Sequence, residues 1–574
     1  MPETLLSPGV LARENDQSFI QGQPLERGAA IIGPAVKGPV EIPTLVGSFS
    51  EYTNIFGGAV QSGSNVYSYL TSIAANNYFQ NGGTSLLVTR VVSGSFTSAT
   101  SSLVPTGSGG PTDGLSPFVL ETISQGAIMN NTGAETSGAL VSGSTDNVRW
   151  EIPTVNTASG TFSLLVRRGD DNNVQKVVLE SYNNLSLDPY ASNYISKVIG
   201  DVDFNLVSDN GDYFIQQSGS YSNISKYVRV KQVNYNTPKY FDNNGIAKAI
   251  FTGSLPAVSS GSFGSAVGSN IPTGRVANYY NNVNGTDSQG LTGANYNNAI
   301  ALLSNVDEYK YNVISIPGLL ASTHSTQTTA IVNNTIGRGD AIAIVDLVAY
   351  NSQINAVINQ ASGFDSSYAA AYWPWLQTID PNTGEAVWVP ASTMLPGVYA
   401  FTDASSDPWF APAGITRGAL GQVIRAERKL TASNRDDIYE ANVNPIATFP
   451  GSGVTVFGQK TLQKRASALD RVNVRRLLIA LKSFIGQVAD GLVFEQNTAA
   501  TRNNFLSQVN PYLESVQQRQ GLYAFKVVMD ETNNGPDVVD RNELVGQIYL
   551  QPTRTAEFII LDFNVLPTGA TFPA

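Results

Sequence analysis

The pattern of apolar segments along the chain changes twice, and this change constrains the fold more than any other feature. Short apolar segments alternate with helical periodicity from Ala29 to Val92, and the same rhythm returns after residue 291. Gly, Ser, Thr and Asn dominate the stretch between them. Alternating strands and helices are typical of an α/β unit. We therefore predict one α/β core that both parts of the chain build, interrupted by an inserted region.

The inserted region has the features of a β-rich domain. It contains the alternating segments FSLLVRR, VQKVVLESY and YVRVKQV, separated by stretches rich in Gly and Ser. A chain of 574 residues also exceeds the ~250 to 300 residues at which one hydrophobic core stops growing. We expect a mixed α+β, multidomain protein in which the insertion is similar to a β-sandwich.

Both ends of the chain are predicted to be extended arms. The first twenty residues have few apolar anchors and a turn signal at Pro8 and Gly9, so they cannot bury themselves. At the other end, apolar residues alternate with a period of two, which is typical of a half-buried strand. The predicted parts are an arm (1–20), the first part of the core (21–92), the insertion (93–290), the second part of the core (291–500) and a C-terminal α/β domain that ends in an arm (501–574).

Charge and composition argue against several classes of function. The net charge is −11, whereas a protein that grips nucleic acid needs a broad basic surface. There is no cysteine, and the one histidine, His324, lies in a Ser/Thr-rich stretch where we expect a surface position. No secretion signal or membrane span is apparent, so we expect a protein made in the cytoplasm, without a cofactor or a metal.

Four motifs suggest chemistry but have simpler readings. GSGVTVFGQKT, residues 451–461, resembles a phosphate-binding loop, but Gln459 displaces the lysine by one position. DETNNGPD, residues 530–537, lacks the last carboxylate of a calcium loop and is expected to be a polar turn. Two RGD sequences, at 168–170 and 338–340, are expected to be turns, and the pair Asp436 and Asp437 is given no catalytic role.

Several longer segments resemble the tail sheath proteins of contractile-tailed phages. The resemblance covers roughly residues 1–92 and 295–574. It rests on SPGV, IIGPAVKGPVEIPTLV and YFQNGGTSLLVTRV near the N-terminus, and on DPWFAPAG, NRDDIYEANVNPIATFPGSGVTVFGQKTL, VFEQNTAATRNNF and DETNNGPDVVDRNELVGQIYLQPTRTAEFIILDF further on. Residues 93–130 and 232–290 lie outside this resemblance, and in this family inserted domains vary and face outward.

The resemblance implies a structural protein that catalyses nothing. Such a subunit assembles in the host cytoplasm as a helical stack of rings around an inner tail tube and becomes part of the virion. Baseplate and tail terminator proteins are the other implied partners, without direct contact to nucleic acid or insertion into a membrane. The sheath shortens and drives the tube through the host envelope for genome ejection.

The resemblance also implies that the arms link subunits by pairing with strands of their neighbours. The residues expected to take part are Leu5, Val10, Leu11, Arg13, Phe558, Ile559, Ile560, Leu561, Phe563 and Val565.

A basic stripe is predicted on a long helix over residues 461–486. At 100° per residue, Lys464, Arg471, Arg475 and Lys482 fall on one side of this helix. Residues 415–485 hold twelve Lys and Arg against five Asp and Glu. The simpler reading is a solvated helix face. Given the resemblance, we expect contact with an acidic tail tube or a neighbouring subunit.

Three alternatives remain open at this point. A sheath subunit of a bacterial contractile injection system would share the fold and differ in its genomic setting. A secreted β-rich enzyme that degrades polysaccharides would share the composition, but no cluster of carboxylates with aromatics is present. A receptor-binding adhesin would be expected to show internal repeats, and none is found.

Overall fold

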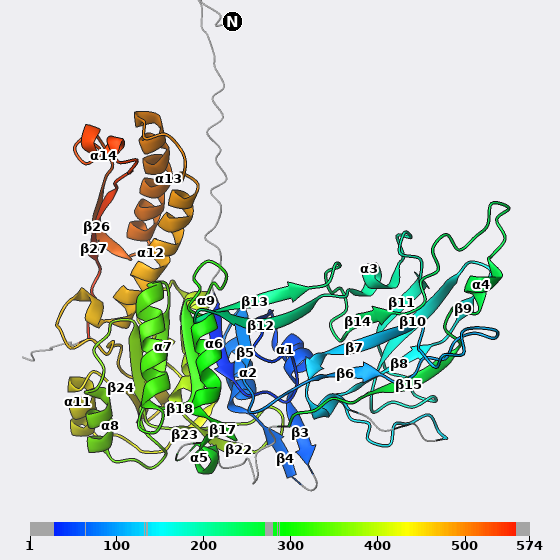
Figure 1. Ribbon diagram of the computed structural model, residues 1–574. Helices are drawn as coiled ribbons and strands as arrows, with labels where there is room; N and C mark the ends of the chain where they lie inside the picture. Colours follow the sequence, from blue (N-terminus) through cyan, green and yellow to red (C-terminus); the bar gives the residue numbers. More distant parts are fainter. Residues whose placement is uncertain are drawn as a thin grey trace, which may run out of the picture. The chain divides into compact units, whose positions relative to one another are not determined.

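The computed structural model describes residues 28–62, 65–130, 133, 136–269, 279–283, 285 and 287–557 (Figure 1). These residues form two compact units. The larger unit holds residues 28–480 together with 555–557, and the smaller one holds residues 481–554.

The larger unit contains a sheet that both parts of the chain build, as predicted. The inner strand β1 pairs in parallel with β5 on one side and with β18 on the other, so Ala30 lies between Leu87 and Ile314. The edge strands β2 and β25 are antiparallel to their neighbours. In spatial order the strands are β2 (Thr44–Val46), β5 (Leu86–Arg90), β1 (Ala29–Gly33), β18 (Val313–Leu320), β19 (Ile342–Asp346), β20 (Ala369–Trp373), β24 (Asn444–Phe449) and β25 (Gly453–Val456).

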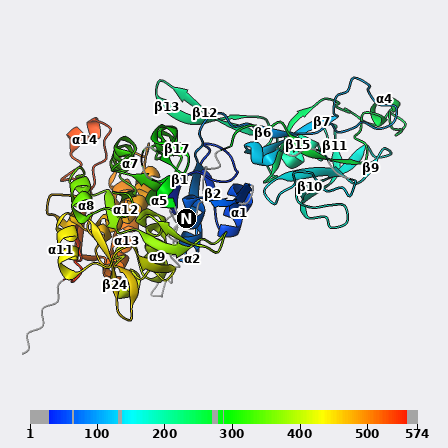
Figure 2. The ribbon, with the colours of Figure 1, turned by 90° about the horizontal axis from the view of Figure 1, so that it is seen from below.

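Helices cover both faces of this sheet, which explains why its inner strands are mostly apolar on both faces. Ile31 packs into the hydrophobic core on one face and Ile32 into the core on the other. Figure 2 shows α7 on one side of β1, and α2 and α9 on the other. The first face packs on α1 (Phe49–Phe56), α2 (Leu70–Gln80) and α9 (Leu395–Ser405), and the second on α6 (Asn297–Leu302), α7 (Ser325–Arg338), α8 (Ile354–Ala361) and α11 (Ala432–Glu440).

Smaller elements complete the core of this unit. They are the hairpin β3 (Ala59–Ser62) and β4 (Asn65–Ser68), α5 (Tyr279–Asn282), β16 (Asp287–Ser288) with β17 (Leu291–Thr292), α10 (Gly414–Arg417), and the sheet of β21 (Leu376–Ile379), β22 (Ala386–Val389) and β23 (Val423–Ala426).

The insertion is β-rich, as expected, but its strands form one continuous sheet. The two edge strands of this sheet, β11 and β14, both contact the short helix α3, so the sheet curls over its own core. Phe118 and Phe162 stack in that core with ring centroids 5.4 Å apart. The spatial order is β11 (Val178–Ser186), β10 (Thr161–Arg168), β8 (Val148–Ile152), β15 (Ser259–Gly264), β6 (Ser98–Ser101), β7 (Phe118–Gln125) and β14 (Val228–Val233), with β9 (Val155–Asn156) beside β10 and α3 at Ile195–Ile199.

Two further elements project from the insertion. The hairpin of β12 (Asp203–Asp209) and β13 (Asp212–Ser218) places Leu206, Tyr213 and Ile215 against the core that α6 covers. The short helix α4 (Ala249–Thr252) precedes β15.

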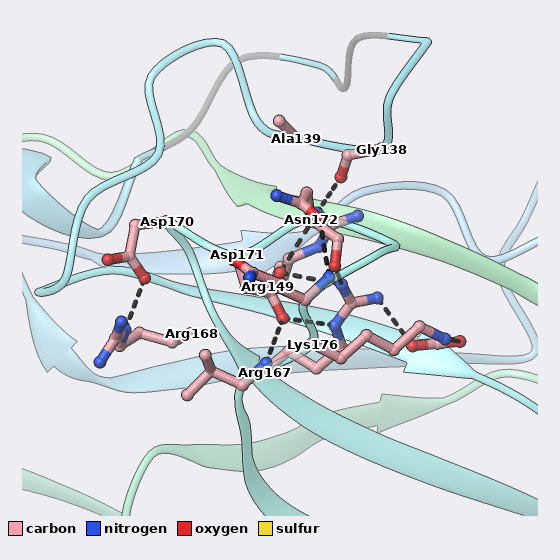
Figure 3. Close-up of polar contacts among 12 residues, drawn as sticks. Gly138, Ala139, Arg149, Arg167, Arg168, Asp170, Asp171, Asn172 and Lys176 are labelled. Carbon is pink, nitrogen blue, oxygen red and sulfur yellow. Dashed lines mark hydrogen bonds and ion pairs between the residues drawn. The ribbon is translucent and has the colours of Figure 1, made fainter.

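A buried ion network stabilises one part of the curled sheet (Figure 3). Asp171 accepts two hydrogen bonds from Arg167, at 2.7 and 2.9 Å, and its carboxylate lies 3.5 Å from Arg149. The side chains of these three residues are fully buried. Arg167 also bonds Glu151 at 2.7 Å, which in turn pairs with Lys176. Burial, with the neighbouring charge of Arg167, lowers the pKa of Arg149.

The smaller unit consists of a helical pair and a hairpin. The helix α12 (Val472–Asp490) enters it at Leu481, and α13 (Ala499–Gln518) follows. Phe484 and Tyr512 stack between these helices with ring centroids 3.8 Å apart. The hairpin of β26 (Leu522–Val528) and β27 (Gln547–Pro552) contacts α13 through β26, and α14 (Pro536–Asp540) lies in the connection between its strands.

The long helix begins eleven residues later than predicted, at Val472 instead of residue 461. Residues 461–471 hold a single 3-10 turn, Ala468–Asp470. The backbone N–H of Thr461 donates to Asp470, and that of Leu462 donates to Ala369 at the start of β20. These tertiary hydrogen bonds override the helical periodicity of the segment.

Candidate assembly surfaces

The hairpin β26–β27 presents an incomplete sheet. Within the described residues it has only these two strands, so each strand leaves one edge of backbone groups without a strand partner. Ile548 and Leu550 are only half-buried, and Tyr549 is 57% exposed. A two-stranded sheet is marginally stable alone, and open edges are the usual place where another strand adds. The hairpin is therefore a candidate acceptor for strands.

The residues predicted to donate strands lie outside the described part of the chain. They are Leu5, Val10, Leu11 and Arg13 in the N-terminal arm, and Phe558, Ile559, Ile560, Leu561, Phe563 and Val565 in the C-terminal arm. Glu557 is the last described residue, and Thr555–Glu557 form no strand.

The base of the C-terminal arm lies against the larger unit. The Glu557 carboxylate accepts hydrogen bonds from Arg471 Nε at 2.7 Å, Tyr439 Oη at 2.9 Å and Gln459 Nε2 at 3.0 Å. Gln459 is 3% exposed and also donates to Thr555 Oγ1 at 2.5 Å. The point where this arm begins is therefore fixed to the core.

The prediction that four basic residues form a stripe on one face of a single helix is wrong. Lys464 and Arg471 precede α12. Lys464 is exposed and its Nζ donates to the carbonyl of Ser362 at 2.7 Å, whereas Arg471 pairs with Asp470 and Glu557. Only Arg475 and Lys482 lie on the helix, one in each compact unit.

Arg475 is a core residue instead of a surface residue. Its side chain is 4% exposed, hydrogen-bonds Ser367 Oγ, and lies 3.9 Å from the ring centroid of Tyr368. Burial lowers its pKa. Lys482, in contrast, is exposed. Of the four residues of the predicted stripe, only Lys464 and Lys482 are exposed, and Arg471 is half-buried.

Reversing the charge of Arg475 is expected to destabilise the core. In Arg475→Glu a carboxylate replaces a guanidinium against the Tyr368 ring, and an uncompensated buried charge costs about 3 to 5 kcal/mol of unfolding free energy. Urea unfolding of the purified monomer measures this loss. Lys482→Glu, an exposed change on the same helix, is the control, with an expected change within about 0.5 kcal/mol. Equal effects of the two variants would contradict the buried position of Arg475.

The structure supports the simple readings of three motifs. GSGVTVFGQKT forms the turn and second strand of the β24–β25 hairpin, with positive φ at Gly451 and Gly453. DETNNGPD is a polar turn in which Asp530 accepts from Thr532 and Asn533 donates to a backbone carbonyl. In the second RGD sequence, Arg338 pairs with Asp340 at 2.9 Å, immediately before β19.

His324 is buried, so the expected surface position is wrong. It is 4% exposed at the start of α7, where Nδ1 lies 2.9 Å from Thr323 Oγ1. It lies in the short connection between β18, a strand of the sheet, and α7, which packs on that sheet, and this explains the burial.

Asp346 is the buried carboxylate that most resembles a catalytic group. Burial raises its pKa to about 6, and it accepts hydrogen bonds from the Ser392 backbone N–H at 3.0 Å and from Ser392 Oγ at 2.5 Å. These bonds join the end of β19 to the turn before α9, which is a structural role.

The described residues contain no group of three His, Cys, Asp or Glu side chains placed to hold a metal. None of the helices they form is long and apolar enough to cross a membrane.

Comparison with protein families identifies the class. Residues 289–462 match the phage tail sheath protein central domain, and residues 465–566 match the phage tail sheath C-terminal domain. The second half of the chain therefore resembles the corresponding part of phage tail sheath proteins, in agreement with the resemblance seen in the sequence. These proteins are structural, in agreement with the prediction that the chain is not an enzyme.

Two individual relatives are tail sheath proteins of phages. The chain is 36% identical over 252 residues to the tail sheath protein of Vibrio phage KVP40, covering 43% of this chain and 37% of that protein. It is 35% identical over 230 residues to the tail sheath protein of Enterobacteria phage T4, covering 40% of this chain and 35% of that protein. The chain thus spans little more than a third of the length of these two relatives.

One solved structure supports the fold along nearly the whole chain. The sheath tail protein of Listeria innocua has a TM-score of 0.52 and 11% identity, covering 93% of this chain and 96% of that one. At this identity the likeness concerns the fold alone. It agrees with a mixed multidomain fold.

Sequence reasoning missed the contacts of Glu557. Its partners Tyr439, Gln459 and Arg471 are 118, 98 and 86 residues away in sequence. The sequence analysis singled out Gln459 only as the residue that displaces the lysine of GSGVTVFGQKT, and nothing in that motif points to Glu557.

Proposed function

We propose that this protein is the structural subunit of a contractile phage tail sheath. It polymerises as a helical sleeve around the tail tube and shortens to drive the tube through the host envelope. The match of residues 289–566 to the central and C-terminal domains of tail sheath proteins, in that order, is the observation that carries this proposal. As a sheath subunit it is a component of the virion, and it has no need of a cofactor.

Strand exchange is the proposed link between subunits. A helical polymer needs head-to-tail contacts, and a contractile one must stay connected while its globular bodies change neighbours. The hairpin β26–β27 is a suitable acceptor because, among the described residues, neither of its outer edges pairs with another strand. Arms from neighbouring copies, including residues 5–13 and 558–565, would supply these strands and complete the sheet.

The remaining partners follow from the same proposal. The inner tube is the partner expected to meet exposed basic side chains such as Lys464 and Lys482. Exposed ion pairs are worth only ~0 to 1 kcal/mol each, so these contacts can be released as the sheath moves. The baseplate and a tail terminator protein would bind the two ends of the sleeve.

A sheath of a bacterial contractile injection system is the second candidate, and it predicts the same polymer. Both curated relatives described above come from phages, which favours a phage tail. A secreted polysaccharide-degrading enzyme finds no support, because the matched domains are those of sheath proteins.

Negative-stain electron microscopy of the purified protein tests the proposal. At high protein concentration we expect hollow tubes with a regular helical repeat, whereas a protein of another class would remain as separate particles. Particles that stay monomeric at every concentration, with and without a co-expressed tube protein, would contradict the proposal.

A further inference from the structure

The C-terminal arm begins at a binding site for its first carboxylate. Three elements that are far apart in sequence supply the donors: Tyr439 from the end of α11, Gln459 from the loop after β25, and Arg471 from the residue before α12. All three reach the one carboxylate of Glu557 within 3.0 Å. We call these four residues the Glu557 clamp.

The donors of the clamp are held in place by contacts other than Glu557. Lys460 Nζ donates to the Tyr439 carbonyl at 2.7 Å and lies 4.4 Å from the Tyr439 ring centroid. The Lys460 backbone N–H donates to Asn444 Oδ1 at 2.6 Å, and Asn444 Nδ2 donates to the carbonyl of Ala371 at 3.1 Å. This loop is thereby tied to strands β20 and β24, so the site is rigid before the carboxylate arrives.

The chemistry of the clamp suits a carboxylate that must stay bound at neutral pH. Burial, together with the charge of Glu557, holds the pKa of Tyr439 well above its ordinary value, so the phenol remains a donor. Hydrogen bonds to a charged group are about twice as strong as those between neutral groups, and three of them act on one side chain. A single exposed ion pair would not hold a chain segment in this way.

We propose that the Glu557 clamp is the anchor that keeps the base of the C-terminal arm on its own subunit while residues 558–574 reach a second copy of this chain. The inference rests on the proposed strand exchange, and it identifies the residues through which tension on the C-terminal arm reaches the rest of the subunit. Tension on a donated strand acts on the clamp and therefore on the sheet through β20 and β24, so movement of one core is passed to its neighbour. Tyr439, Gln459 and Arg471 are positioning residues in this account.

Trypsin cleavage after Arg554 in the folded monomer tests the anchor directly. Arg554 is exposed, and the bond that follows it lies three residues before Glu557. Cleavage requires the segment to leave the clamp, so its rate reports how often the clamp opens. We expect Glu557→Ala to raise the rate roughly tenfold or more, and Tyr439→Phe, which leaves the cleaved sequence unchanged, to raise it about threefold.

The matched control is Asp470→Asn. It removes the other ion pair of Arg471, at 3.0 Å, and leaves the donors to Glu557 in place, so we expect a rate within about twofold of the parent chain. Synthetic peptides of residues 550–561 with and without Glu557→Ala correct for the sequence preference of trypsin. The proposal that the clamp anchors the arm would be overturned by either of two results. One is an unchanged cleavage rate in Glu557→Ala and Tyr439→Phe, and the other is a rate in Asp470→Asn that rises as much as in those variants.

The anchor and the proposed function can fail separately. If the parent chain forms no tubes although cleavage follows the expected order, the sheath proposal fails and the Glu557 contact remains. If the parent chain forms tubes, the proposal predicts that Glu557→Ala, folded as a monomer by circular dichroism, yields at least fivefold fewer tubes than Asp470→Asn. Equal tube yields for these two variants would overturn the role of the clamp in assembly.

Discussion

Removal of residues 1–15 is expected to abolish tube formation and to leave a folded, soluble monomer. The deletion takes away the apolar side chains Leu5, Val10 and Leu11, which the N-terminal arm would place in the sheet of a neighbour. It leaves every described residue in place, because those begin at residue 28. Circular dichroism and size-exclusion chromatography report the fold of the monomer, and negative-stain microscopy counts the tubes.

The matched control keeps the length of the arm and removes only its ability to pair. Replacing residues 1–15 by a Gly/Ser segment of equal length should fail to form tubes in the same way, because a flexible linker supplies no apolar strand. Tubes in normal number from either variant would show that the N-terminal arm has no part in linking subunits.

The second large effect is expected inside the insertion. In Asp171→Ala the fully buried guanidinium of Arg167 loses its bidentate partner, and Arg149 loses the only carboxylate with which it forms an ion pair among the described residues. Breaking a buried pair by removing one partner costs about 3 to 5 kcal/mol. We expect that loss in the unfolding free energy of the curled sheet, measured by hydrogen exchange of the amides of β8 and β10.

The neighbouring residue Asp170 supplies the control. Its ion pair with Arg168 is partly exposed, at 28% and 39% for the two side chains, so Asp170→Ala is expected to cost only ~0 to 1 kcal/mol. A loss of 3 kcal/mol or more in both variants, or in neither, would show that the buried network does not stabilise the sheet as described.

The local pattern of apolar residues predicted two kinds of element: strands that are buried on both faces, and strands in which buried and exposed residues alternate regularly. The two stretches predicted to build one α/β core do supply its strands, including β1, β18 and β19, because strands buried on both faces need apolar runs. The insertion was correctly expected to be β-rich. The curl of its sheet was missed, because α3 joins two edge strands that are separate in sequence.

The errors arose where distant contacts override local periodicity. Residues 461–471 have a helical spacing of charges, yet the backbone N–H groups of Thr461 and Leu462 donate to the carbonyls of Asp470 and Ala369, and neither bond belongs to a helix. Arg475 was placed on a surface, because the sequence does not reveal that Tyr368 and Ser367 cover it. The Glu557 clamp depends on partners 86 or more residues away, which periodicity cannot detect.

The central claim is that subunits are linked by strands that pass between them. A map of the assembled tube at side-chain resolution tests it most directly. We expect residues 558–565 of one copy to run along an open edge of the β26–β27 hairpin of another, with Glu557 still held by Tyr439, Gln459 and Arg471 of its own copy. A map in which both ends of every chain pack on their own subunit, with the edges of the hairpin unpaired, would contradict it.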